Sequence, residues 1–240
     1  MFRQFTEFIL PRIIGVMVHK REILTKKERI AQDQFLVNLD IKKRKTEKPV
    51  IAAIIGLVGS GKSSVAQELA RHIGATVIEG DAIRIELGKQ DEYYDRARAI
   101  AENAAIEVVK QGGNAILDSD FVDEKKRASI REKARTARVR LIFVRTVCDF
   151  DVMTQRIRDN DPGEFFNNAS SSSKVPDKGK DVKMREMLRR LPHHYRHVNQ
   201  GGGKWLLKKF PFPVFAEIDT TDSVSWKRDV KKCAEKLLTG

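Results

Sequence analysis

The residues with the clearest chemical potential form an unbroken run, Gly56-Leu57-Val58-Gly59-Ser60-Gly61-Lys62-Ser63, which matches the pattern G-x-x-x-x-G-K-[ST]. Glycines in such a loop allow backbone angles that turn successive N–H groups inward, where they bind phosphate oxygens together with the N-terminus of the following helix. A lysine at this position reaches the β- and γ-phosphates of a nucleotide, and the hydroxyl after it binds Mg²⁺. The residues expected to bind the nucleotide are Gly56, Val58, Gly59, Ser60, Gly61, Lys62, Ser63 and Ser64.

Two acidic residues follow the next two apolar segments of the chain. Asp81 comes just after residues 75–79, and Arg84 lies one helical turn later on the same face. A carboxylate there would lie across the sheet edge from the γ-phosphate and accept a proton from a substrate hydroxyl, while Arg84 would hold an anionic substrate or orient the base. Asp118 ends the segment 114–118. A carboxylate at the carboxyl end of such a strand is typical of a Walker B residue, which would bind the same metal ion as Ser63. An N-cap role for Asp81 and a purely structural role for Asp118 remain open alternatives.

The elements that must position these residues alternate along the chain. Residues 50–57 form a continuous apolar run rich in β-branched side chains, typical of a strand buried on both faces. Similar runs occupy residues 75–79, 114–118, 139–144 and 214–219. Helical periodicity occupies residues 63–73, 93–110, 124–136, 150–158 and 224–238. This alternation predicts an α/β fold of three layers, with a mainly parallel five-stranded sheet, helices on both faces, and ligands at the carboxyl ends of the strands.

One region interrupts the alternation. Residues 159–180 are rich in Asn, Ser, Gly and Pro, which suits a mobile loop. Residues 181–198 have a helical pattern crowded with arginine and histidine, so we expect a cationic lid at about 156–200 that closes over charged substrate. A loop that is merely mobile, followed by a solvated basic helix, is the alternative. His193 and His197 have the spacing of a metal pair, but no acidic ligand lies near them in the sequence, and we expect no metal there.

Taken in order, these residues resemble a known family. The succession of Gly59-Ser60-Gly61-Lys62-Ser63, Asp81 with Arg84, a helix containing Tyr93 and Tyr94, and Ile-Leu-Asp at 116–118 is similar to the small P-loop kinases of the polynucleotide kinase, zeta-toxin and gluconate kinase type. The resemblance covers about residues 50–240. It implies the three-layer fold of P-loop NTPases and leaves the first 48 residues unexplained.

The resemblance also implies roles for individual residues. Lys62 and Ser63 would hold the phosphates of ATP and Mg²⁺, and Asp81 would act as the base, with Arg84 beside the acceptor. Arg156 and Arg158 would neutralise charge on the transferred phosphoryl group from the lid.

The expected function is therefore Mg²⁺-assisted in-line transfer of the γ-phosphoryl group of ATP to a hydroxyl of a small-molecule or polynucleotide acceptor. By the same resemblance, residues 218–222 occupy the position of an adenine contact. A nucleotide-dependent switch or regulatory ATPase that binds a partner or membrane through its N-terminal arm is the alternative.

The positive charge of the chain is unevenly distributed. The chain has 240 residues and a net charge of +13, yet its first 49 residues alone hold 12 lysines and arginines against 6 acidic residues. We expect a basic helical arm at 1–48, with an amphipathic helix at about 20–40, followed by a kinase domain at 49–240. The arm packs on the main domain or on a second copy, contacts nucleic acid, or lies on a membrane. The apolar face expected at a membrane is Phe2, Phe5, Phe8, Ile9 and Leu10.

The sequence gives little reason to place the chain in a membrane or outside the cell. The apolar stretch at 8–18 is shorter than the ~20 residues that a membrane-spanning helix needs. Two cysteines, Cys148 and Cys233, are too few for a disulfide framework. We therefore expect a cytoplasmic protein, while its oligomeric state stays open.

Overall fold

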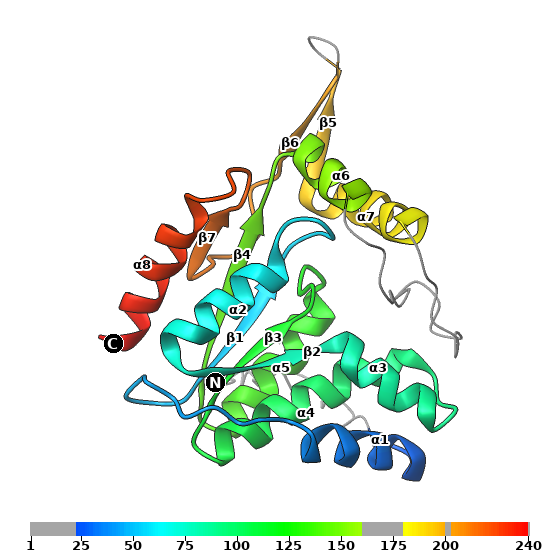
Figure 1. The fold of residues 1–240 in the computed structure, drawn as a ribbon, viewed down its shortest axis with the longest axis vertical. Helices are drawn as coiled ribbons and strands as arrows, with labels where there is room; N and C mark the ends of the chain where they lie inside the picture. Colours follow the sequence, from blue (N-terminus) through cyan, green and yellow to red (C-terminus); the bar gives the residue numbers. More distant parts are fainter. Residues whose placement is uncertain (1–22, 160–179, 200–202, 240) are drawn as a thin grey trace, which may run out of the picture.

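Five parallel strands form the centre of the molecule (Figure 1). The computed structural model describes residues 23–159, 180–199 and 203–239. The strands are β1 (Val50–Ile55), β2 (Ala75–Glu79), β3 (Asn114–Asp118), β4 (Arg140–Val147) and β7 (Ala216–Asp219). They pair in the order β2-β3-β1-β4-β7. The predicted five-stranded parallel sheet is confirmed.

Helices cover both faces of this sheet, and strand β1 is therefore buried on both sides. Its alternate residues from Val50 onward pack with α2 (Lys62–Ile73) and α8 (Trp226–Leu238) on one face. The residues between them pack with the second layer of helices. That layer consists of α3 (Gly80–Lys89), α4 (Ala97–Lys110) and α5 (Glu124–Thr136). The predicted three-layer α/β architecture is therefore confirmed.

Two parts of the predicted helix pattern need correction. The helix expected at 93–110 is a short 3₁₀ turn, Tyr94–Arg96, followed by α4. Helix α3 was expected only as the helical turn that brings Asp81 and Arg84 to one face, and it extends to Lys89. The helical pattern at 181–198 is wrong at its end, because α7 (Lys180–His194) gives way to strand β5 (Tyr195–Val198), which pairs antiparallel with β6 (Lys204–Leu207). Tyr195 turns into the core, where its hydroxyl donates to the backbone oxygen of Cys148 at 2.6 Å.

The region predicted as a lid lies at the carboxyl end of the sheet. Figure 1 shows α6 (Phe150–Asp159), α7 and the β5–β6 hairpin together beyond the arrowheads of β1 and β4. Buried side chains of α6 and α7 form one apolar cluster with Leu57 of the glycine-rich loop. Residues 160–179 of the predicted lid lie outside the described residues.

The N-terminal arm contributes a helix to the main domain. Helix α1 (Lys26–Val37) begins with a capping box, in which Thr25 and Glu28 each accept a hydrogen bond from the backbone N–H of the other. Its buried residues Ala31 and Phe35 join the core formed by α3 and α4. Part of the helix expected at about 20–40 is therefore present, as α1 at 26–37, and packs on the main domain. The apolar residues expected at a membrane, Phe2, Phe5, Phe8, Ile9 and Leu10, lie outside the described residues.

No helix among the described residues combines the length and the hydropathy needed to cross a lipid bilayer.

The basic run Lys42-Lys43-Arg44-Lys45 is built into the edge of the domain. Lys45 donates from its backbone to Ile73 and from Nζ to Arg71, both at 2.9 Å, at the C-terminal end of α2. The guanidinium of Arg44 donates to the backbone oxygen of Gly112, which follows α4. Cations are favourable at helix C-termini because they offset the partial negative charge of the last carbonyl groups. These basic residues thus stabilise the ends of two helices.

Replacing Phe35 with alanine tests the docking of α1. Because Phe35 is only 7% exposed, Phe35→Ala should leave a cavity and lower the free energy of unfolding by about 3 kcal/mol, measured by urea denaturation. Val37 ends the same helix and is 81% exposed, so Val37→Ala is the matched control and should change stability by less than about 0.5 kcal/mol. Equal effects of the two substitutions would contradict the docking.

Candidate phosphate-binding and acceptor site

The glycine-rich loop joins β1 to α2, as its sequence predicts. Gly59 and Gly61 have φ angles of +83° and +76°, in the left-handed region that favours glycine. At Gly56 the constraint is space, because a Cβ atom there would collide with the hydroxyl of Thr146 on β4. The backbone of the loop can therefore adopt this path only with glycine at these positions.

Hydroxyl groups from two strand ends hold the loop in place. The hydroxyl of Ser60 lies 2.8 Å from that of Thr146 at the end of β4. The hydroxyl of Thr220, just after β7, donates to the backbone oxygen of Ser60 at 2.9 Å. Thr220 is one of the residues expected near the adenine. In the structure it is buried, with 2% of its surface exposed, and contacts the loop. The N–H groups of the loop are fixed in this way by residues distant in the sequence.

Lys62 extends along the loop into a group of charged side chains. Its Nζ donates to the backbone oxygen of Leu57 at 2.9 Å. Burial lowers the pKa of Lys62, and the carboxylates of Asp118 and Asp120, followed by Asp81, oppose this shift. The lysine and three carboxylates from the ends of β2 and β3 therefore act on one another at the carboxyl edge of the sheet.

Asp81 and Arg84 form the pair that their spacing predicts. Oδ1 of Asp81 accepts a hydrogen bond from Nη1 of Arg84 at 2.6 Å. The N-cap of α3 is Glu79, so the alternative N-cap role of Asp81 is not what the structure contains. The side chain of Asp81 is 52% exposed and that of Arg84 only 11%. The arginine is thus buried behind a carboxylate that is accessible to a substrate.

Asp118 and Ser63 are suitable ligands for a magnesium ion. Asp118 ends β3, and among the described residues its carboxylate makes no hydrogen bond or ion pair. Ser63 is exposed in the first turn of α2, and its hydroxyl likewise has no partner in the described ranges. Mg²⁺ prefers oxygen ligands and usually keeps several waters and substrate phosphates in its coordination shell. Two protein oxygens beside a phosphate-binding loop therefore fit it.

The described part of the chain contains no group of three or more His, Cys, Asp or Glu residues placed to hold a metal ion. Of the two histidines with metal-pair spacing, His197 packs edge-on against Trp205, with ring centroids 5.1 Å apart.

The two arginines predicted for the lid lie in different environments on α6. Arg156 is half-buried, and its Nη1 donates to Thr220 Oγ1 at 3.2 Å and to the backbone oxygen of Gly59 at 3.4 Å. Arg158 is exposed. Residues two positions apart on an α-helix point about 200° apart, so the two side chains leave α6 in nearly opposite directions. The structure brings Arg156 to the loop and leaves Arg158 on another side of the helix.

Three candidate functional residues, one just after β3 and two on α7, were not identified from the sequence. Asp120, two residues after Asp118, is 7% exposed and forms an ion pair with Arg190 of α7 at 2.7 Å. His194 Nε2 lies 3.4 Å from the same carboxylate oxygen. Burial raises the pKa of Asp120. The hydrogen bond with His194 and the charge of Arg190 lower that pKa by more, so it lies well below its usual range. The crowding of arginine in 181–198 was the available signal for Arg190.

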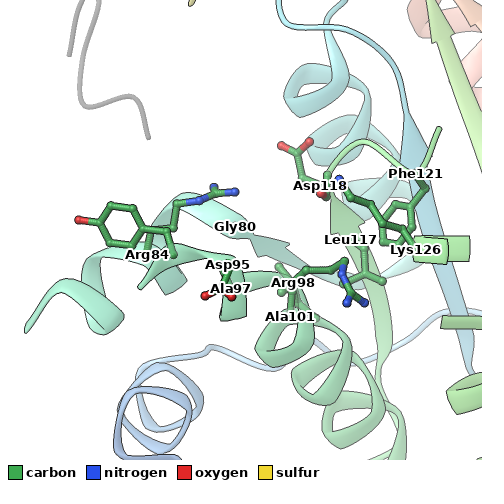
Figure 2. A pocket seen from close by; sticks show the side chains of 13 residues that line it. Gly80, Arg84, Asp95, Ala97, Arg98, Ala101, Leu117, Asp118, Phe121 and Lys126 are labelled. Atoms are coloured by element: carbon green, nitrogen blue, oxygen red, sulfur yellow. The ribbon is translucent and has the colours of Figure 1, made fainter. Parts of the chain in front are cut away.

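A cavity of about 200 Å³ opens beside Asp118 (Figure 2). It lies between the end of β3 and helices α3, α4 and α5. Its charged lining residues are Arg84, Asp95, Arg98, Asp118 and Lys126. Arg98 and Lys126 were not predicted, because nothing in the sequence indicates that α4 and α5 turn these side chains toward the strand ends.

Comparisons with known proteins agree with the observed fold. Residues 51–166 match the AAA_33 family model, described as an AAA domain. A solved structure of a candidate kinase from Chloroflexus aurantiacus is similar with a TM-score of 0.53 and 17% sequence identity, over 80% of this chain and 100% of that chain. The chain has the fold of the small P-loop kinases. The resemblance expected from the sequence is thereby confirmed.

Further small P-loop kinases are similar at lower scores. A gluconokinase from Sinorhizobium meliloti has a TM-score of 0.47 and 17% identity, over 82% of this chain and 96% of that chain. The APS kinase CysC of Mycobacterium tuberculosis, in complex with AMPPNP and APS, has a TM-score of 0.45 and 15% identity, over 80% of this chain and 96% of that chain. A comparison with curated proteins finds no match.

The contact between Asp120 and α7 should stabilise this P-loop kinase fold. Asp120→Ala removes the nearer of two carboxylates paired with the largely buried Arg190 and should lower the free energy of unfolding by about 3 kcal/mol in urea denaturation. Asp40 forms an ion pair with Lys42 but is 76% exposed, so Asp40→Ala should cost less than about 1 kcal/mol. An Asp120→Ala protein as stable as the Asp40→Ala control would show that the buried pair contributes nothing.

Proposed function

We propose that the chain is an ATP-dependent kinase that transfers the γ-phosphoryl group of ATP to a hydroxyl group of an acceptor. The observation that carries this proposal is the cavity beside Asp118, which opens at the same sheet edge as the phosphate-binding loop. A kinase must hold a second substrate next to the γ-phosphate, and the cavity supplies that space. A nucleotide switch would need the loop alone.

On the donor side, the N–H groups of the loop and Lys62 would bind the β- and γ-phosphates. Lys62 would exchange its hydrogen bond with Leu57 for one with a phosphate oxygen. Ser63 and Asp118 are the residues that would hold Mg²⁺. When bound, Mg²⁺ neutralises charge on the β- and γ-phosphate oxygens.

On the acceptor side, Asp81 would be the general base. Its carboxylate takes the proton of the acceptor hydroxyl, whose oxygen forms a bond to the γ-phosphorus as the bond to the oxygen of the β-phosphate breaks. ADP leaves with that bonding electron pair. Arg84 would act as a positioning residue, because its 2.6 Å hydrogen bond fixes the orientation of the Asp81 carboxylate.

Positive charge for the transferred phosphoryl group would come from Arg156 and Arg190. Arg156 already contacts the backbone of the loop at Gly59. The charge of Arg190 acts on Lys62, which supports a role for its guanidinium at the phosphates that Lys62 would bind. Arg158 is exposed on another side of α6, so we assign the second positive charge to Arg190. Fixed cations of this kind stabilise the charge that spreads over the phosphoryl oxygens in transfer.

The alternative function, a nucleotide-dependent switch, was based on an arm without a catalytic explanation. Helix α1 of that arm packs on α3, the helix that carries Asp81 and Arg84. Its docking supports the helix on which the proposed base lies. Among the described residues, the arm therefore gives no independent support to a switch.

A transfer assay decides between the two functions. The protein is incubated with γ-labelled ATP and a panel of nucleosides, sugars and 5′-hydroxyl oligonucleotides. We expect label on at least one acceptor, and no transfer with Lys62→Ala, because the lysine that binds the β- and γ-phosphates is absent. Release of labelled phosphate without transfer to any acceptor would favour the switch.

The two carboxylates should fail in different ways. Asp81→Asn removes the base and should lower kcat by about 10²- to 10⁴-fold while ATP binding stays unchanged. Asp118→Asn weakens the metal site and should raise the Mg²⁺ concentration that gives half-maximal activity. Asp40→Asn, an exposed carboxylate outside the site, is the control. An unchanged kcat for Asp81→Asn, or the same Mg²⁺ dependence for all three variants, would show that the roles are wrongly assigned.

A further inference from the structure

The cavity beside Asp118 has more cationic than acidic side chains in its wall. Arg84, Arg98 and Lys126 line it, against Asp95 and Asp118. In Figure 2, Arg84 and Lys126 extend toward the same space from opposite sides, from α3 and α5, and Arg98 extends from α4. Arg84 is held by Asp81. Arg98 and Lys126 are therefore the cations whose purpose the proposed transfer step does not explain.

Lys126 is a half-buried cation with little protein compensation. Its Nζ makes one hydrogen bond, of 3.4 Å, to the backbone oxygen of Asp120, and it forms no ion pair with any described residue. Burial lowers the pKa of Lys126 and the charge of Arg190 lowers it further, while Asp120 and Asp123 oppose this shift. Because removing a cation from water is costly unless an anion lies close by, a negatively charged ligand in the cavity would stabilise this lysine.

Arg98 is held in a fixed orientation at the same cavity. Its Nη1 donates to Oε1 of Glu102 at 2.7 Å. Glu102 is fully buried and also binds Lys133 at 2.9 Å and Ser129 at 2.6 Å. An arginine that is already immobilised loses little conformational entropy when it binds an anion. Arg98 is therefore suited to bind a phosphate or carboxylate group.

The rest of the wall limits the size of the ligand. Apolar residues Leu117, Phe121, Ala97 and Ala101 are buried and form part of it. The cavity of about 200 Å³ holds several water molecules or a small organic molecule. This space suits a sugar-sized molecule, whereas a polynucleotide could place only its terminal group inside.

We propose that the acceptor is a small hydroxyl compound that carries a phosphate or carboxylate group, and that Lys126 and Arg98 bind this group. This inference rests on the proposed kinase function, because only a kinase would bind an acceptor in this cavity. Binding of an anion in the cavity does not require turnover, so the first experiment measures binding.

The binding experiment fills the phosphate-binding loop with Mg²⁺ and a non-hydrolysable ATP analogue and then titrates inorganic phosphate or acetate by calorimetry. We expect at least one of these anions to bind, and Lys126→Gln to weaken it by about tenfold or more, the effect of losing one charged hydrogen bond. Lys126→Arg should keep the binding. Lys125 is the exposed neighbour, so Lys125→Gln removes the same charge and should bind as the native protein does.

Each outcome of this titration bears on the proposal. Binding of phosphate alone identifies a phosphorylated acceptor, and binding of acetate a carboxylate. Binding of neither anion, or equal binding by the native, Lys126→Gln and Lys125→Gln proteins, overturns the inference. Failure of the ATP analogue to bind is seen separately and counts against the proposed kinase function.

Transfer to matched acceptors tests the same site during turnover. The pairs are ribose with ribose 5-phosphate, glucose with gluconate, and adenosine with adenosine 3′-phosphate, beside a 5′-hydroxyl oligonucleotide. We expect a charged small acceptor to have the highest kcat/KM, and Lys126→Gln to lower that value without affecting its neutral partner. Transfer that is equal within every pair, or best with the oligonucleotide, overturns the inference and leaves the kinase function standing.

Discussion

The glycine-rich loop passes so close to its neighbours that side chains are excluded at Gly56, Gly59 and Gly61. A Cβ atom at Gly59 would lie 2.9 Å from the backbone oxygen of Met153 on α6, and one at Gly61 would lie 3.2 Å from Thr220 after β7. At Gly56 the obstacle is Thr146 on β4. Three elements that follow the loop by many residues thus define its path. The direction of the N–H groups proposed to bind phosphate therefore depends on these three elements at the carboxyl edge of the sheet.

Charge at this edge connects the loop to the helix above it. Asp120 of the segment after β3 binds Arg190 of α7 directly and also acts on the charge of Lys62 in the loop. These groups are largely buried, so water screens them less than it would at the surface. Movement of α7 would therefore change the electrostatic environment of Lys62 at the same time. The charge of Lys62 and the position of α7 are therefore linked through Asp120 and Arg190.

The sequence predicted best the features that depend on neighbouring residues. The helix expected at 124–136 has those bounds in α5, and the pattern around Lys62 lies between a buried strand and a helix, as expected. The paired orientation of Asp81 and Arg84 follows from helical spacing alone. In each case the pattern lies within a few residues, where the backbone geometry leaves few alternatives.

Features that depend on distant residues were missed. The cluster of Asp120, Arg190 and His194 joins residues 70 or more positions apart, and periodicity says nothing of such contacts. Strand β5 interrupts an apparently helical pattern because it pairs with β6. The role of Arg156 and Arg158 in neutralising phosphoryl charge stays a prediction, and their helical spacing gives the two side chains different directions.

The net charge of +13 acquires a different meaning in the folded protein. Arg44 and Lys45 of the basic arm bind backbone oxygens at the ends of helices, so part of the surplus stabilises the domain itself. Arg190 is paired with Asp120, and its charge also acts on Lys62 of the loop. Lys126 differs from these, because it is half-buried in a cavity wall and makes no ion pair with the described residues. Selectivity for an anionic acceptor would therefore arise from one enclosed cation and its neighbour Arg98, and the overall charge of the chain is a poor guide to it.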